Sequence, residues 1–140
     1  MREILFRGKT EDNKWEYGYP YETYRNCHTR KVIAQPPNAF GCGKYTEVIS
    51  RTVGQFTGIT DKNGVKIFEH DIIQVPDDFD VYGYNAGEIY EVYFAYGGFR
   101  LKPKYNKKAR GYWLEDDLEL HIIGNIHDNP ELLEGGVENG

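Results

Sequence analysis

The 140-residue sequence contains only two cysteines, Cys27 and Cys42, and one methionine. Two cysteines cannot form the disulfide framework of a small secreted protein. No apolar run follows the opening MREILFRGK to act as a signal peptide, and the apolar clusters are far shorter than the roughly 20 residues that cross a bilayer. We therefore expect a soluble, cytoplasmic protein with no membrane-spanning segment.

Sequence motifs for catalysis and cofactor binding are also missing. Neither GxxxxGK nor GxGxxG occurs, so no glycine-rich phosphate loop is predicted. Acid–base catalysis needs two carboxyl groups with well-separated pKa values, whereas the acidic runs here are flanked by proline and glycine and are typical of solvated segments. These runs contain Asp77, Asp78 and Asp80, and Glu115, Asp116, Asp117 and Glu119. We expect no catalytic residues and no cofactor.

Cysteine and histidine are the usual zinc ligands, but their spacing here does not match a zinc motif. Both CxxC and HExxH are missing. Cys27, His28 and Cys42 fall in one weakly patterned segment, yet a fourth ligand would have to come from elsewhere in the chain. An idle thiol pair is the preferred interpretation. A metal-dependent hydrolase that uses His121 and His127 is the least supported alternative.

The charge balance disfavours strong attraction to phosphate, because 22 acidic residues outnumber 17 basic ones and the formal charge is -5. One local exception is FRLKPKYNKKARGYW, residues 99–113, which holds six cations and no acid. Cations could neutralise phosphates there while aromatic rings stack on bases. The candidate nucleic-acid-binding residues are Arg100, Lys102, Lys104, Tyr105, Lys107, Lys108 and Arg110. The alternative, favoured by the net acidity, is a solvated hairpin with Phe99 and Trp113 in the core.

The residues that are abundant, 16 glycines and 12 tyrosines, favour strands and turns. EILFRG alternates in period two, and WEYGYPY places Trp15, Tyr17, Tyr19 and Tyr21 at every second position. TEDNK between them supplies turn residues. The two segments therefore predict a hairpin around Asp12-Asn13.

The central stretch GQFTGITDKNGVKIFEHDIIQV predicts two strands joined at Asn63-Gly64, a pair in which both residues tolerate positive φ. A calcium loop would need glycine sixth and glutamate twelfth from Asp61, but those positions hold Lys66 and Ile72. Turn chemistry is therefore the preferred interpretation. A second reversal is expected at residues 69–71, before a strand that ends at Pro76.

Later segments continue the β pattern. GEIYEVYF and GFRL predict a strand pair joined through residues 95–97, and Leu118, Leu120 and Ile122 alternate before a bend at Gly124. A helical turn at 113–117 is an open alternative. Residues 129–135 carry the signals of a short helix with proline first and glycine last. Residues 25–46 predict a long irregular loop with one short strand, RKVIAQ.

Three of these segments resemble the YopX-like family of phage and prophage proteins. They are MREILFRGKTEDNKWEYGY, TVGQFTGITDKNGVKIFEHDII and IIGNIHDNPELL, in this order, at residues 1–19, 52–73 and 122–133. The resemblance implies a β-fold with SH3-like barrel character and implies no biochemical activity. One departure is His70, where the family pattern EGD has glycine. If that position has positive φ, its histidine is strained.

The sequence thus predicts a mainly β domain over residues 1–134, or two small β subdomains sharing a core, followed by a flexible tail at 135–140. We expect a phage-derived, non-catalytic binding or assembly module in the cytoplasm of the bacterial host. Its partner would meet an aromatic-lined face, and self-association into an oligomer is a further expectation. The alternative function is nucleic-acid binding through residues 99–113.

Overall fold

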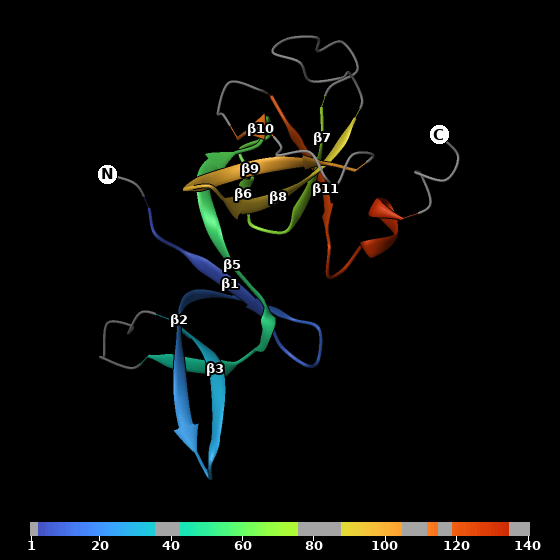
Figure 1. The fold of residues 1–140 in the computed structure, drawn as a ribbon. Helices are drawn as coiled ribbons and strands as arrows, with labels where there is room; N and C mark the ends of the chain where they lie inside the picture. Colours follow the sequence, from blue (N-terminus) through green and yellow to red (C-terminus); the bar gives the residue numbers. More distant parts are fainter. Residues whose placement is uncertain (1–2, 36–42, 76–87, 105–111, 115–118, 135–140) are drawn as a thin grey trace. The chain divides into compact units, whose positions relative to one another are not determined.

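The computed structural model describes residues 3–35, 43–75, 88–104, 112–114 and 119–134, and these residues form a mainly β structure (Figure 1). The strands are β1 (Phe6–Lys9), β2 (Trp15–Arg25), β3 (His28–Gln35), β4 (Lys44–Glu47), β5 (Ile49–Thr60), β6 (Lys66–Phe68), β7 (Asp71–Gln74), β8 (Ile89–Ala95), β9 (Gly98–Pro103), β10 (Tyr112–Trp113) and β11 (His121–Asn125). The mainly β prediction is confirmed. Within the described residues the strands form two antiparallel sheets that do not close, so the implied SH3-like barrel is not seen there.

The chain divides into two compact units, residues 1–56 and 57–140. One sheet has the order β4-β3-β2-β1-β5-β6, and β5 continues from the first unit into the second. In the first unit Ile33, Val48 and Phe56 are buried. Gly8 allows close packing there, because a Cβ at Gly8 would lie 2.8 Å from a methyl carbon of Val48. The first unit therefore buries apolar side chains of its own, with Val48 packed closely against Gly8.

The second unit is built on a five-stranded sheet with the order β10-β9-β8-β7-β11. On β8 the buried residues Tyr90 and Val92 alternate with partly buried ones, as expected when one face of a sheet packs on a core, whereas β7 is buried at three consecutive residues, 71–73. The buried apolar cluster of this unit consists of Ile67, Ile73, Val75, Tyr90, Val92, Leu101, Leu114 and Leu120. On β8 and β9 the alternate positions include polar and aromatic side chains, those of Glu91, Tyr93, Arg100 and Lys102.

Two hairpins close with the same four-residue turn, at Thr10–Asn13 and Asp61–Gly64. In each, the fourth N–H donates to the first carbonyl, over 3.1 Å and 3.0 Å, and the fourth residue is left-handed, with φ 67° at Asn13 and 81° at Gly64. The first side chain also accepts from the following N–H, that of Lys14 or Val65. Both predicted hairpins are confirmed. The predicted positive φ at Asn63 is wrong, because a four-residue turn of this kind bends back at its last residue.

Two other hairpins use two-residue turns in which both residues are left-handed. Tyr96 and Gly97, with φ 55° and 84°, join β8 to β9 as predicted. Asn26 and Cys27, with φ 52° and 64°, join β2 to β3. The loop prediction for residues 25–46 needs correction, since β3 is eight residues long and β4 pairs beside it. The turn was missed because cysteine is not a typical residue of such turns.

The end of the described chain agrees in part with the prediction. β11 has the irregularity expected near Gly124, where the pairing with β7 shifts between Ile122 and Gly124. The predicted C-terminal helix is one 3-10 turn, Pro130–Leu133, and the side chain of Asn129 does not cap it. That side chain accepts instead from the N–H of Asn125, over 3.3 Å. The predicted strand end at Pro76 and the predicted tail lie outside the described residues.

Asp61 connects its turn to β11. Its carboxylate accepts from the N–H groups of Asn63 and Val65, over 2.8 Å and 3.0 Å, and from that of Ile122, over 3.4 Å. Burial of the side chain opposes its ionisation, but these backbone donors outweigh burial and hold the pKa of Asp61 below its ordinary value. The ionised carboxylate therefore stabilises the folded state.

The substitution Asp61→Asn should lower the free energy of unfolding at neutral pH by about 1–3 kcal/mol, the usual worth of hydrogen bonds to a charged group. Because the folded-state pKa is depressed, the contribution of the charge is present above the unfolded pKa and is lost as pH falls through the folded one. Urea unfolding at a series of decreasing acidic pH values should show that the difference in free energy of unfolding between wild type and variant becomes smaller as the pH falls. Asp12→Asn, at an exposed carboxylate in the equivalent turn, is the matched control and should have a much smaller effect.

His70 forms the reversal between β6 and β7 with φ 76°. This is the positive φ at which the sequence predicts that a histidine would be strained. The backbone there is fully used: the His70 N–H donates to Val92 and its carbonyl accepts from Ile126. The Asp71 carboxylate closes the reversal by accepting from Phe68 over 2.8 Å. The Nδ1 atom of His70 is buried without a hydrogen-bond partner in the described residues. His70 thus combines backbone strain with an unsatisfied ring nitrogen.

Replacing His70 by glycine should remove the strain, whereas His70→Ala should keep the strain and lose only the ring. We expect the glycine variant to be more stable than the alanine variant by about 1 kcal/mol, the cost of a left-handed backbone for a residue with Cβ. Thermal or urea unfolding of the two variants measures this directly. Equal stability would contradict a strained backbone at this position.

Candidate functional site

The most distinctive surface of the first unit is a row of exposed tyrosines. Tyr17, Tyr19 and Tyr21 alternate on β2, so they share one face of the sheet, and they are 44%, 47% and 42% exposed. Across the sheet, Tyr19 lies opposite Ala34, which lies opposite Tyr45 of β4. We call these four tyrosines the tyrosine surface. The tyrosines of the predicted period-two row thus face solvent, whereas Trp15, the first residue of that row, is half-buried beside Arg7.

Tyr45 was missed by the sequence because it lies in the segment predicted as a loop. It is 64% exposed, and its ring meets that of Tyr21 edge to face with centroids 5.6 Å apart. The two rings come from strands on either side of β3, in which Val32, the residue paired with Tyr21, is 7% exposed. No short-range signal marks Tyr45, because β4 is only four residues long.

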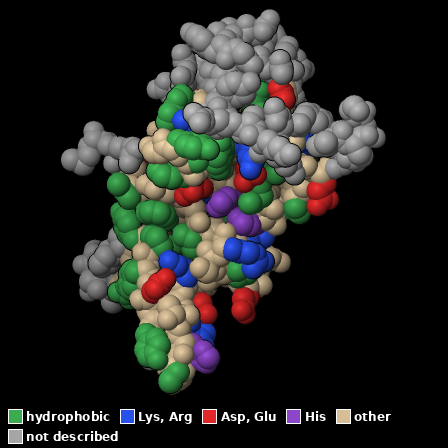
Figure 2. Space-filling model, in the orientation of Figure 1, with side chains coloured by type: hydrophobic (Ala, Val, Ile, Leu, Met, Phe, Trp, Pro, Cys, Tyr) green, Lys and Arg blue, Asp and Glu red, His purple; other side chains and the backbone are tan. Residues whose placement is uncertain are grey.

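An open groove of about 650 Å³ continues from the tyrosine surface toward the β2–β3 turn. Tyr24, which is 73% exposed, and Tyr45 contribute aromatic walls. Arg30 and Glu47 form an ion pair in the lining of the groove, in which one guanidinium nitrogen, Nη1, donates to both carboxylate oxygens, at 2.9 Å and 3.0 Å. These two charges neutralise each other. The remaining lining residues are Thr23, Asn26 and Val32. In the lower part of Figure 2, hydrophobic side chains lie at the surface in separate patches among charged and other side chains.

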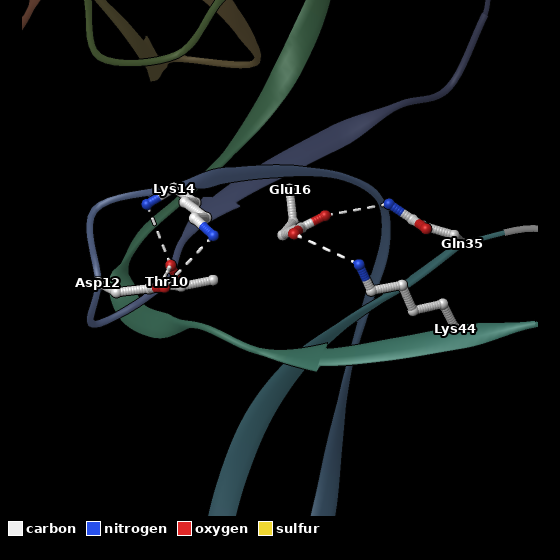
Figure 3. Close-up of polar contacts among 6 residues, drawn as sticks. All are labelled: Thr10, Asp12, Lys14, Glu16, Gln35 and Lys44. Carbon is white, nitrogen blue, oxygen red and sulfur yellow. Dashed lines mark hydrogen bonds and ion pairs between the residues drawn. The ribbon is translucent and has the colours of Figure 1, made fainter.

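The opposite face of the same strands carries polar contacts that fasten them together (Figure 3). Glu16, which alternates with Tyr17, accepts from Gln35 of β3 over 3.1 Å and pairs with Lys44 of β4 at 3.8 Å. These contacts join β2, β3 and β4 through side chains as well as through backbone pairing. They hold in register the three strands that present the tyrosines.

The edge strand β4 is poorly suited to binding another strand. It is short, and charged residues at both of its ends, Lys44 and Glu47, are engaged in ion pairs with Glu16 and Arg30. Short edges that carry charge are a usual protection against strand addition. Binding at this part of the protein should therefore use the face of the sheet rather than its edge.

The sequence-predicted nucleic-acid segment is only partly described. Arg100, Lys102 and Lys104 lie on β9 or directly after it, whereas Tyr105, Lys107, Lys108 and Arg110 lie outside the described residues. Arg100 is 7% exposed, because its guanidinium packs against aromatic rings. Of the two aromatic residues assigned to a core, Phe99 packs against the buried cluster, but Trp113 is 48% exposed.

The residues considered for metal binding or hydrolysis are not brought together. Within the described part of the chain, no group of three or more His, Cys, Asp or Glu side chains is placed to hold a metal. Cys27 is exposed at the β2–β3 turn, and Cys42 lies outside the described residues. His127 meets His70, with ring centroids 5.3 Å apart, rather than His121. Of the acidic runs, only Glu119 is described.

The same described residues contain no helix that is both long enough and apolar enough to cross a membrane. The protein is mainly β, with antiparallel sheets and two compact units, and it exposes a row of tyrosines. A family model described as YopX protein matches residues 5–134, so the chain belongs to the YopX family. The family prediction is therefore confirmed.

A solved structure supports the fold. The chain is similar to protein EF1440 from Enterococcus faecalis, with 24% sequence identity and a TM-score of 0.58. The similarity covers 96% of this chain and 100% of that one. At this level of identity the likeness concerns the fold alone. A search of the curated proteins finds no match.

Proposed function

We propose that this protein is a non-catalytic binding module of phage or prophage origin whose tyrosine surface binds another polypeptide in the host cytoplasm. The observation that carries the proposal is the sharing of one sheet face by Tyr17, Tyr19, Tyr21 and Tyr45, each at least 42% exposed. Tyrosine is enriched at protein interfaces because its ring buries much apolar area while its hydroxyl forms hydrogen bonds. Contiguous aromatic patches on a surface usually mark interaction sites.

The charges around the tyrosine surface favour a polypeptide over a nucleic acid. Arg30 is paired with Glu47, and Lys44 with Glu16, so these cations already have carboxylate partners. A phosphate backbone needs cations that it can neutralise. A largely uncharged polypeptide segment would instead bury tyrosine rings and leave these ion pairs in place. Its partner is a second copy of the chain or another protein.

The test places a photo-crosslinking amino acid at Tyr45 and, as a matched control, at Glu22, which is exposed on the other face of β2. We expect a discrete crosslinked polypeptide in host cells from position 45 and none from position 22. Mass spectrometry separates a second copy from a different protein, and both support the proposal. Equal crosslinking at the two positions, none at either, or a nucleic-acid adduct alone would overturn it.

With the photo-crosslinking amino acid moved to position 21, the double substitution Tyr19→Thr and Tyr45→Thr should abolish the crosslink to the partner while leaving the fold intact. Threonine keeps the strand preference of tyrosine, and the side chains of Tyr19 and Tyr45 are 47% and 64% exposed. We therefore expect the free energy of unfolding to change by less than about 1 kcal/mol. Loss of a tyrosine that is a binding hot spot costs about 2 kcal/mol or more, roughly a thirtyfold loss of affinity. Thermal unfolding beside the crosslinking yield distinguishes these effects. A strongly destabilised variant would instead assign the tyrosines to structure.

A further inference from the structure

A second aromatic site lies in the unit of residues 57–140, on the sheet face opposite its core. Trp113 of β10 pairs with Arg100 of β9, and its ring occupies the space above Gly98. A Cβ at Gly98 would lie 2.4 Å from Cζ3 of the indole. The absence of a side chain at Gly98 therefore lets the ring rest on β9. With 48% of its surface exposed, Trp113 is held in place yet open to a ligand.

Arg100 lies between two aromatic rings. Its Cζ is 3.8 Å from the ring centroid of Trp113 and 5.0 Å from that of Tyr96, and its Nε donates to the Ala95 carbonyl over 3.2 Å. The side chain is nine-tenths buried, and no carboxylate of the described residues pairs with it. Aromatic faces compensate a buried cation only in part. An incoming anion would supply the missing opposite charge.

Lys102 extends the same face. It alternates with Arg100 on β9, and its Nζ lies 5.7 Å from the ring centroid of Tyr93, which pairs with Arg100. No carboxylate in the described part of the chain forms an ion pair with Lys102. The neighbouring acid, Glu91, lies 4.0 Å from Nδ1 of His70. Aromatic rings and cations thus lie side by side across three strands, β8, β9 and β10.

We propose that Trp113, Arg100, Tyr93 and Lys102, the stacking platform, bind single-stranded nucleic acid. Trp113 stacks on an unpaired base, while Lys102 and the buried Arg100 attract the adjoining phosphates. Base–aromatic stacking beside cations is the usual recognition of single strands and tolerates any sequence. A duplex fits poorly, because its bases are already stacked on each other. This proposal does not depend on the tyrosine surface, which belongs to the other unit.

The structure changes the site that the sequence suggested. The sequence pointed to cations throughout residues 99–113, whereas the platform uses two of them with Trp113, which is fixed by Gly98. Tyr93 lies outside that segment and joins the platform because β8 pairs with β9. The two cations have no carboxylate partners among the described residues, and they lie beside the exposed ring of Trp113 and the half-buried ring of Tyr93. Such a site suits a polyanion that carries bases better than a polyanion without them.

The test uses tryptophan fluorescence in a Trp15→Phe background, where Trp113 is the one remaining tryptophan. We expect oligothymidylate to quench this fluorescence saturably at low salt. Two phosphate contacts predict a slope of about −1.4 for the logarithm of the binding constant against that of the salt concentration. A duplex of equal length and an inorganic polyphosphate should bind at least tenfold more weakly. Absence of quenching at low salt, or equal binding of polyphosphate, would overturn the proposal.

Two variants test the geometry. Gly98→Ala moves the indole without removing a charge and should weaken oligothymidylate binding at least tenfold. Lys102→Gln should reduce the salt slope by about 0.7, as for one lost phosphate contact. Lys62→Gln, at an exposed lysine of the same unit, is the matched control and should change neither quantity. Circular dichroism shows whether each variant is folded. Unchanged oligothymidylate binding by both test variants would contradict the proposal that the stacking platform is the binding site.

Discussion

Register in this protein depends on residues held in the left-handed conformation at the ends of its hairpins. Asn13 and Gly64 close four-residue turns, and two-residue turns join β2 to β3 and β8 to β9. Because side chains alternate along a strand, a slip of one residue would exchange the two faces of a sheet. These few backbone angles therefore decide which side chains are buried and which are displayed.

Because successive side chains of a strand point to opposite faces, the same strand can bury some residues and expose aromatic residues on its other face. On β2, the residues beside the tyrosines fasten the strands from the other face, through Glu16 with Gln35 and Lys44. On β9, Leu101 is buried in the core while Arg100 and Lys102 lie on the opposite face. In both units the contacts on one face of a strand fix the side chains on its other face. Rigid aromatic side chains lose little conformational entropy on binding.

The two surfaces differ in electrostatics, and this difference separates their proposed ligands. Near the tyrosine surface the cations are paired with carboxylates, which leaves aromatic rings and hydroxyls to make contacts. On the stacking platform Arg100 has rings rather than a carboxylate beside it. Membership of the YopX family and likeness to EF1440 define the fold that displays both surfaces. The chemistry of each surface follows from this chain's own side chains.

The sequence by itself determined the mainly β class, the hairpins at residues 10–13, 61–64 and 95–97, and the tyrosine row on β2, because alternation and turn residues are local signals. It also identified the position of His70 as one where positive φ would matter. Only the tertiary structure decided that Tyr45 joins this row, that Arg100 is buried, and that Trp113 rests on Gly98. Those arrangements arise from pairing between strands, whose partners and register are set by contacts distant in sequence.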